Sequence, residues 1–322
     1  MRGDWHTASA PGKFVILGEH SVVYGKPAIT LATDLRMTVA VRRSAWNTMN
    51  GEKLDFRRQA HIRHLTRNLR HAIDMLTYSE IPVGSGMGSS AALSASMAMA
   101  LASMEGQEMT EEQIMREAYD AEFYAQGNGS PMDASSCVHG GGLTVNMPDS
   151  EGKRLWTVER GGRRWEFRDL EIPRMTFVIG NTGIRAPTGP QVAKVHRYME
   201  RNRFACEVID DIADVTIEGG NALRRNDMEA LGRLMTQDHK LLSILGVSCD
   251  SLNKLVNASL PYSYGAKLTG SGGGGCMVAL TDTPEQVCEA IRSRGGTPYV
   301  IRTGGRGVSM EPNPPNVPGT DR

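Results

Sequence analysis

The sequence has no excess of either charge, no hydrophobic run long enough for a membrane span, and no paired cysteine motif. Lysine plus arginine and aspartate plus glutamate number 36 each among 322 residues, so the formal net charge is zero. This balance gives no reason to expect nucleic acid or an anionic membrane as a partner. The most apolar segment, around residues 91–102, is too short to cross a bilayer, and the polar N-terminus lacks the apolar core of a signal peptide. We therefore expect a cytoplasmic protein.

Other common site types are also missing. The five cysteines are odd in number and scattered, with no CxxC pair, which indicates reduced structural thiols rather than a disulfide framework or a zinc site. No GxxxxGK[ST] string occurs, which argues against a P-loop nucleotidase. A GxGxxG string at 270–275 leads into an apolar strand pattern instead of a helix, so the context of a dinucleotide-binding motif is absent.

Hydrophobic periodicity predicts an α+β protein in two parts. Strands are expected between 13 and 43 and at 143–147, 164–180, 264–269, 276–281 and 297–302. Helices are expected near 58–75, at 89–103, 111–126 and 283–294, and through most of 190–260 with breaks near Gly219–Gly220 and Gly246. Thr110 and Gln113 form a capping box that marks the start of the helix at 111–126. We place a domain boundary near residue 172, giving domains 1–172 and 173–310 and a disordered proline-rich tail, 311–322.

Three alternating glycines precede a helix of small residues at 82–102. Glycine allows positive φ angles and close backbone approach, so successive N–H groups of such a loop can point at an anion, and the helix start adds its own free amides. The alternative, a glycine-rich turn before a well-packed helix, remains open, because such turns are common. The predicted phosphate-binding residues of this segment are Gly84, Ser85, Gly86, Met87, Gly88, Ser89 and Ser90.

Two acidic residues fall on apolar helix faces. Glu122 lies four residues after Ala118 in an apolar stripe, and Asp238 shares a face with several leucines. A carboxylate that faces a core needs a partner or a metal. Each acid could also lie harmlessly at the edge of its stripe, and Asp133 could be a simple helix cap. Together with the glycine loop, the two acids favour a cleft between domains.

Three ordered segments resemble the motifs of the superfamily of galactokinases, homoserine kinases, mevalonate kinases and phosphomevalonate kinases. They are APGKFVILGEHSVVYG at 10–25, PVGSGMGSSAAL at 82–93 and KLTGSGGGGCMVAL at 267–280. The first is similar to the mevalonate kinase family in its APGK, GEH and VVYG elements. GNGSPMD at 127–133 resembles the family's GNPSGVD with an altered order, and the short chain resembles the compact archaeal and bacterial members.

The resemblance implies a two-domain fold, with an N-terminal half like the second domain of ribosomal protein S5 and a ferredoxin-like C-terminal half. ATP and an alcohol would meet between them. The roles it implies are Lys13 and Asp133 as catalytic residues, Ser90 and Glu122 as Mg²⁺ ligands, Glu19, His20 and Asp133 as mevalonate-binding residues, and Gly272 and Gly273 as further support for the phosphates.

The implied activity is ATP-dependent phosphorylation of the C5 hydroxyl of mevalonate, in isoprenoid biosynthesis. Asp133 would take the hydroxyl proton, and Lys13 would keep Asp133 ionised. Homoserine, phosphomevalonate or a sugar could replace mevalonate as the substrate. A decarboxylase of diphosphomevalonate or a non-catalytic sensor on the same fold are further alternatives. We also expect a homodimer, as is common in the superfamily. His61, His64 and His71 are expected to lie on a solvated basic helix.

Overall fold

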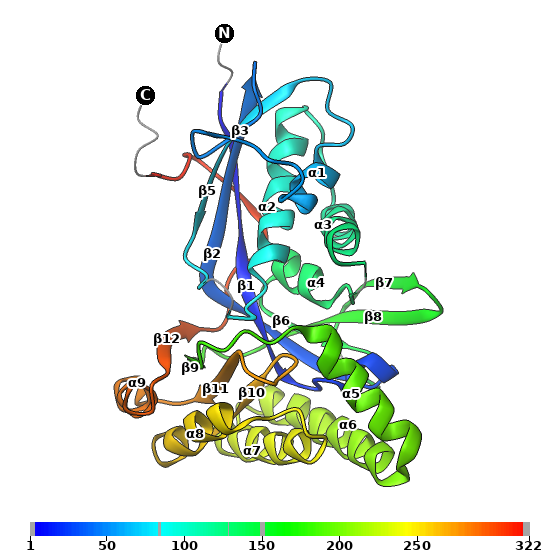
Figure 1. Ribbon diagram of the computed structural model, residues 1–322, viewed down its shortest axis with the longest axis vertical. Coiled ribbons are helices and arrows are strands. Elements are labelled where there is room, and N and C mark those ends of the chain that lie inside the picture. Colours follow the sequence, from blue (N-terminus) through cyan, green and yellow to red (C-terminus); the bar gives the residue numbers. More distant parts are fainter. Residues whose placement is uncertain (1–3, 83–84, 128, 149–151, 318–322) are drawn as a thin grey trace.

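The strands of the chain form two sheets, which a computed structural model describes over residues 4–82, 85–127, 129–148 and 152–317 (Figure 1). The first sheet runs in the order β4-β3-β5-β2-β6-β8-β7, and β1 pairs with both β2 and β13. Its strands are β1 (His6–Leu17), β2 (Ala28–Ser44), β3 (Thr48–Met49), β4 (Glu52–Lys53), β5 (Ala72–Ser79), β6 (Gly142–Val145), β7 (Arg154–Arg160), β8 (Arg163–Leu170) and β13 (Ser309–Glu311). The alternating patterns near the N-terminus therefore become two long central strands, β1 and β2.

Helices cover one face of this sheet (Figure 1). They are α1 (Ala60–Leu65), α2 (Ser89–Met104), α3 (Glu111–Gln126) and α4 (Met132–His139). The alanines and serines of α2 let its backbone pack closely on β1 and β2. α3 begins at the predicted capping box, in which the Thr110 hydroxyl accepts the Gln113 amide hydrogen and the Gln113 side chain accepts that of Thr110. Both predicted helices are thus confirmed.

The second sheet has the order β10-β11-β9-β12, and all its pairs are antiparallel. Its strands are β9 (Thr176–Asn181), β10 (Gly265–Thr269), β11 (Cys276–Leu280) and β12 (Thr297–Arg302). The helices are α5 (Thr188–Arg201), α6 (Arg203–Arg224), α7 (Met228–Ile244), α8 (Asp250–Ser259) and α9 (Pro284–Ser293). Helices separate β9 from β10 and β11 from β12, the strand–helix–strand–strand–helix–strand order of a ferredoxin-like unit. The α+β class is confirmed. The boundary near residue 172, which remains a prediction, falls between β8 and β9.

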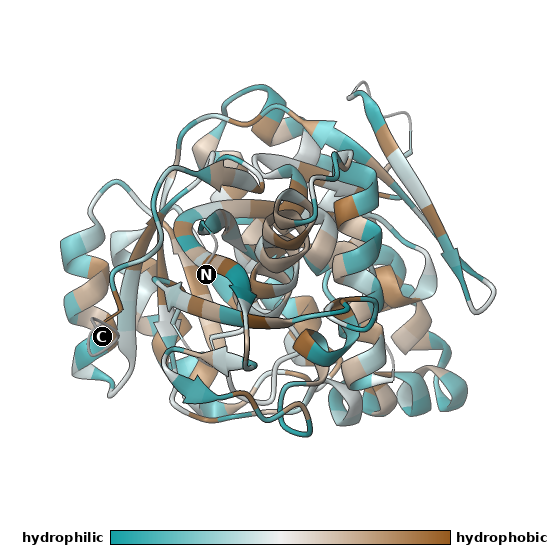
Figure 2. Cartoon of the chain, turned by 90° about the horizontal axis from the view of Figure 1, so that it is seen from above, coloured by the Kyte–Doolittle hydropathy of each residue, from teal (hydrophilic) through white to brown (hydrophobic). Residues whose placement is uncertain are grey.

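One hydrophobic cluster joins the two sheets. Phe14 of β1 and Phe177 of β9 meet edge to face, with ring centroids 5.0 Å apart. Leu17 and Val278, from the first and second sheets, belong to the same buried cluster. Seen from above, apolar residues gather in the middle of the molecule and hydrophilic ones around the rim (Figure 2). The ends of β1 and of the second sheet are therefore held against each other, which places the motifs at their ends side by side.

The helix predicted near residues 58–75 is wrong in its second half. The chain is helical only over α1, and residues 72–79 form β5, which pairs along its length with β2. Ile73 and Met75 are fully buried on one face of this strand. The edge of β2 offers a complete set of backbone partners, and this non-local pairing overrides the local helical pattern.

Two glycines that were expected to break a helix lie inside α6. α6 continues through Gly219 and Gly220, and the chain turns only at Arg225–Asp227. A Cβ at position 219 would lie 2.1 Å from Leu17 Cδ1. Glycine is present here because α6 crosses β1 at close range, not because the helix ends. The expected break at Gly246 is confirmed, since this residue has a φ of 75° and follows the last turn of α7.

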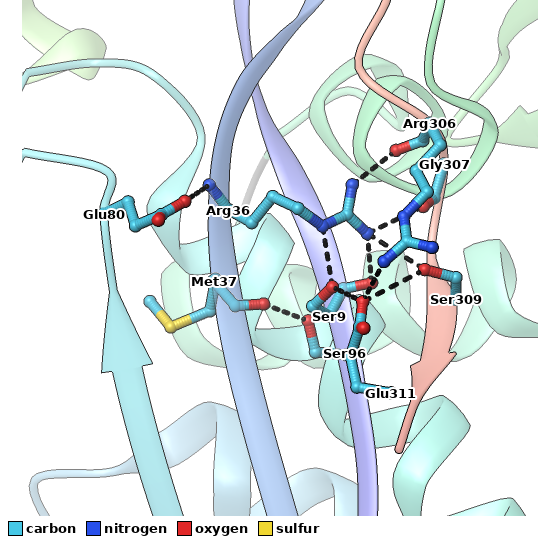
Figure 3. A network of polar contacts seen from close by, with 9 residues as sticks. All are labelled: Ser9, Arg36, Met37, Glu80, Ser96, Arg306, Gly307, Ser309 and Glu311. Atoms are coloured by element: carbon cyan, nitrogen blue, oxygen red, sulfur yellow. Dashed lines mark hydrogen bonds and ion pairs between the residues drawn. The ribbon is translucent and has the colours of Figure 1, made fainter. Parts of the chain in front are cut away.

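The C-terminal segment returns to the start of the chain (Figure 3). The Arg36 guanidinium in β2 donates hydrogen bonds to Ser9 and to the carbonyl oxygens of Arg306 and Gly307, and β13 pairs with β1. Ser9 also donates to Glu311, 2.6 Å away. Glu311, the first residue assigned to the tail, is therefore held in β13, while residues 318–322 lie outside the described part of the chain.

Among the described residues, no helix combines the length and the apolar character needed to cross a membrane. All five cysteines are described, and none forms a disulfide.

Candidate active site

Lys13 and Asp133 form an ion pair at the centre of the candidate site. Lys13 lies in β1 where a bulge interrupts the register with β2, and Asp133 lies in the first turn of α4. Lys13 Nζ is 2.8 Å from Asp133 Oδ1, with side chains 6% and 36% exposed respectively. Burial alone would lower the pKa of Lys13. The negative charges around it, led by Asp133, raise this pKa by more than burial lowers it, so the net shift is upward. The lysine is therefore a permanent cation beside a carboxylate that water or a substrate can reach.

Ser90 and Glu122 form a second pair next to the first. Ser90 lies in the first turn of α2, and its hydroxyl donates to Glu122 Oε1 at 2.6 Å. Burial, and then the charge of Asp133, raise the pKa of Glu122 to about 7. The acid that the sequence placed on an apolar helix face thus has a hydrogen-bond partner, Ser90. Because burial and a neighbouring carboxylate cause this shift, a dication bound beside Glu122 would lower its pKa again.

The oxygens of this pair suit a hard cation. Mg²⁺ prefers oxygen ligands and commonly binds one or two protein groups together with phosphate oxygens. Among the described residues, no cluster of three histidine, cysteine, aspartate or glutamate side chains forms a metal site alone. Ser90 and Glu122 supply oxygen donors of the kind that such a cation binds together with phosphate oxygens.

The glycine loop leads into α2 beside Lys13. Gly86 and Gly88 have φ angles of 72° and 70°, the left-handed region that favours glycine. A Cβ at Gly88 would lie 2.9 Å from Lys13 Cγ, and the Lys13 amide donates to Met87 O. The Met87 side chain is buried, so this residue can offer only its backbone to a ligand. The amides of Ser89 and Ser90 lie in the first turn of α2, where helix geometry gives them no carbonyl partner. Gly84 lies outside the described residues.

The loop at 270–275 packs against the turn after α7. Gly272 and Gly273 have φ angles of 75° and 74°, and the Gly273 amide donates to Val247 O at 2.7 Å. A Cβ at Gly272 would lie only 2.0 Å from the same Val247 oxygen. Because the Gly273 amide already has a partner, this loop can support a phosphate through its position more readily than through that N–H group.

Glu19 and His20, the predicted substrate residues, lie deep between the sheets. His20 has a φ of 61° and donates from Nε2 to Ser271 O at 3.0 Å, so it ties the first motif to the third. Glu19 accepts a hydrogen bond from Lys267, and both side chains are almost completely buried. Burial lowers the pKa of His20, which favours a neutral ring. Their role in substrate binding remains a prediction.

A buried lysine in β10 holds two carboxylates. Lys267 Nζ contacts Glu19, lies 3.2 Å from Asp238 Oδ2 and donates to Leu268 O at 2.8 Å. Burial, and secondarily the charge of Glu19, raise the pKa of Asp238 well above its usual range. The second apolar-stripe acid thus has a partner too. Lys267 was not among the predicted site residues, although a lysine inside an apolar strand was a signal that could have identified it.

His61 does not lie on a solvated surface, so that prediction is wrong. The residue is partly buried, with Nε2 2.9 Å from Ser90 Oγ and 4.0 Å from Glu122 Oε1. His64 and His71 are partly buried as well, and His71 follows α1 rather than lying in it. Only a contact between distant segments brings His61 to the site, so local sequence patterns could not reveal it.

The two halves of the chain match one protein family. Residues 56–141 match the GHMP kinases N terminal domain, and residues 221–297 match the GHMP kinases C terminal domain. The chain belongs to the GHMP kinases. Within this family it is 32% identical to the mevalonate kinase of Pyrococcus furiosus, with 94% of this chain and 98% of the relative aligned. It is 33% identical to the mevalonate kinase of Thermococcus onnurineus over the same shares of both chains.

Solved structures of the family share the fold. The L. major mevalonate kinase in complex with R-mevalonate superposes with a TM-score of 0.81 at 21% identity, covering 95% of this chain and 98% of that one. The Methanococcus jannaschii mevalonate kinase gives 0.77 at 23% identity, covering 94% and 99%. The predicted two-domain GHMP kinase fold is therefore confirmed over nearly the whole chain.

Proposed function

We propose that this GHMP kinase transfers the γ-phosphoryl group of ATP to the C5 hydroxyl of mevalonate, as a mevalonate kinase. The observation that carries the proposal is the Lys13–Asp133 pair, set beside the glycine loop and the start of α2. Full-length relatives more than 30% identical to the chain are mevalonate kinases, which supports this substrate over homoserine, phosphomevalonate or a sugar.

Asp133 is the group that accepts the proton. The C5 oxygen forms a bond to the γ-phosphorus, the bond from that phosphorus to the bridging oxygen breaks, and ADP leaves with the electron pair. The hydroxyl proton passes to an Asp133 carboxylate oxygen, which is open enough to reach a substrate. Lys13 remains protonated, and its positive charge stabilises the negative charge of the γ-phosphate and of Asp133.

Ser90 and Glu122 would hold Mg²⁺, which when bound neutralises charge on the phosphates. The backbone amides of the glycine loop and of the α2 start bind phosphate oxygens, and the helix dipole adds to this attraction. Glu19 and His20 would line the mevalonate side, with their positions fixed by Lys267 and Ser271. Phosphoryl transfer depends mainly on such positioning and charge stabilisation. A homodimer and a cytoplasmic location remain predictions from the sequence.

A coupled ADP-release assay tests the proposal. Mg-ATP is offered with mevalonate, 5-phosphomevalonate, homoserine or galactose, and Asp133→Asn is run beside the wild type. We expect turnover with mevalonate and a kcat roughly 10³-fold lower in the variant. Turnover of another alcohol would replace the substrate while keeping the kinase, and ADP release from none of them would contradict catalysis altogether.

A further inference from the structure

His61 reaches the Ser90–Glu122 pair from a segment outside the glycine and lysine motifs. It lies in α1, which packs against both α2 and α3, the helices that carry Ser90 and Glu122. The next residue, Ile62, is completely buried and anchors α1 in the core. The placement of the His61 ring is therefore set by packing and is not a chance surface contact.

The hydrogen atoms at this cluster can be assigned. Ser90 has one hydroxyl proton, and it points to Glu122 Oε1 at 2.6 Å. The contact between Ser90 Oγ and His61 Nε2, at 2.9 Å, then needs a proton from the ring, so Nε2 carries it. A chain of two hydrogen bonds runs from His61 through Ser90 to Glu122, and it fixes the direction of the serine hydroxyl.

The contact could be purely structural, but its surroundings argue otherwise. The His61 side chain is 23% exposed and that of Glu122 13%, so the cluster opens to solvent rather than filling a core. The Ser90 oxygen keeps a further lone pair, and Glu122 has a second oxygen. Groups held behind a metal ligand in this way orient it, and their loss typically lowers metal affinity about 10- to 100-fold.

We propose that His61 is a positioning residue for the cation that accompanies the nucleotide. Its Nε2–H holds the Ser90 hydroxyl so that Ser90 and Glu122 present oxygens to one cation. The inference rests on the proposed function, because it takes Ser90 and Glu122 as the cation ligands. Its chemical requirement is a single hydrogen-bond donor at the position of Nε2.

Binding of a fluorescent ATP analogue, measured with Mg²⁺ and again in EDTA, tests this role without turnover. We expect His61→Ala to weaken binding about 10-fold in Mg²⁺ and to leave binding in EDTA unchanged. His61→Gln, which keeps a donor, should restore affinity to within about threefold of wild type. His64→Ala is the matched control: His64 lies one turn further along α1, where its ring contacts Tyr124, and this variant should bind like the wild type.

Ser90→Ala separates the inference from the proposed function. If Ser90→Ala weakens Mg²⁺-dependent binding and His61→Ala does not, the cation site stands and the role of His61 is wrong. If His61→Ala weakens binding equally in Mg²⁺ and in EDTA, His61 acts on the nucleotide or the fold, and positioning of the cation is also wrong. If neither variant changes Mg²⁺-dependent binding, the proposed cation site itself is overturned.

Discussion

Lys13 and Lys267 are both buried lysines near two carboxylates, yet their surroundings differ. Lys13 pairs with Asp133, which is 36% exposed, and Glu122 lies nearby. Lys267 pairs with Glu19 and Asp238, and all three side chains are at most 2% exposed. The same charge arrangement is thus open to a substrate at Lys13 and closed to water at Lys267. We call the buried set of Lys267, Glu19 and Asp238 the sealed site. Access to water therefore separates a lysine that can serve chemistry from one that holds two halves of a site together.

Lys267→Met should have the largest effect on stability. It leaves two carboxylates buried without a counter-charge, which is expected to reduce the free energy of unfolding by about 3–5 kcal/mol. Denaturant unfolding followed by circular dichroism measures this loss. Lys254→Met, an exposed change in α8, is the control and should stay within about 0.5 kcal/mol of the wild type. Equal stability of both variants would mean that the sealed site contributes nothing to folding.

Lys13→Met should show the opposite pattern. Loss of the cation beside the reacting groups is expected to lower kcat about 10³-fold. Because Asp133 keeps contact with water, the free energy of unfolding should fall by only about 1 kcal/mol. Steady-state kinetics and the same unfolding experiment give both numbers. A variant that unfolds easily but turns over normally would reverse the assignment of the two lysines.

His239, which lies next to the sealed site, makes the stability of the protein sensitive to acid. Its Nδ1 accepts the Leu268 amide hydrogen, and burial, with help from the charge of Lys267, lowers its pKa from 6.5 to about 4. Between these pH values the unfolded chain binds a proton that the folded chain does not, so stability falls as pH falls from 6.5 toward 4. The loss reaches about 3 kcal/mol.

His239→Asn keeps an acceptor near the Leu268 amide but cannot titrate. Unfolding free energies of both proteins at several pH values between 4 and 7 should therefore diverge, with the variant losing less at the acid end. Parallel curves would show that other groups, such as His20, account for the acid sensitivity.

A pair of glycine variants should give the smallest effect. Gly86 and Gly88 have nearly equal φ angles, 72° and 70°, so alanine at either position costs about 1 kcal/mol of backbone strain. Only at Gly88 would the new Cβ meet Lys13, whereas nothing lies within 4 Å of one at Gly86. We expect similar unfolding midpoints, but a kcat several-fold lower for Gly88→Ala than for Gly86→Ala. Identical kcat values would show that Lys13 has room to move.

Much of the fold followed from local patterns. α2, α3, β11 and β12 lie within a residue or so of their predicted limits, because their apolar periods, caps and flanking turns agree with each other. β5 did not follow, because its residues read locally as helix and only the pairing with β2 makes them a strand. Gly219 inside α6 misled for a similar reason: the side chain that requires a glycine there is Leu17, some two hundred residues earlier.

The residues of the candidate site also fall into those that the sequence indicated and those that only the structure brought to light. Glu122 and Asp238 were suspected from the sequence, because a carboxylate on an apolar helix face requires a partner. The partners themselves, Ser90 with His61 for the first and Lys267 with Glu19 for the second, come from other elements. Periodicity reports which face of a helix is buried, but not which side chain of another segment meets it.

The sequence by itself determined the α+β class, the glycine loop at the start of a helix, the family, and the acids that a core cannot hold unpaired. Each of these depends on residues close together in the chain or on motifs in a fixed order. Only the tertiary structure decided which lysine lies beside a partly exposed carboxylate and which is fully buried, and that His61 contacts Ser90. Exposure and contact are properties of elements packed against each other, and the segments that meet at these two lysines are up to 248 residues apart.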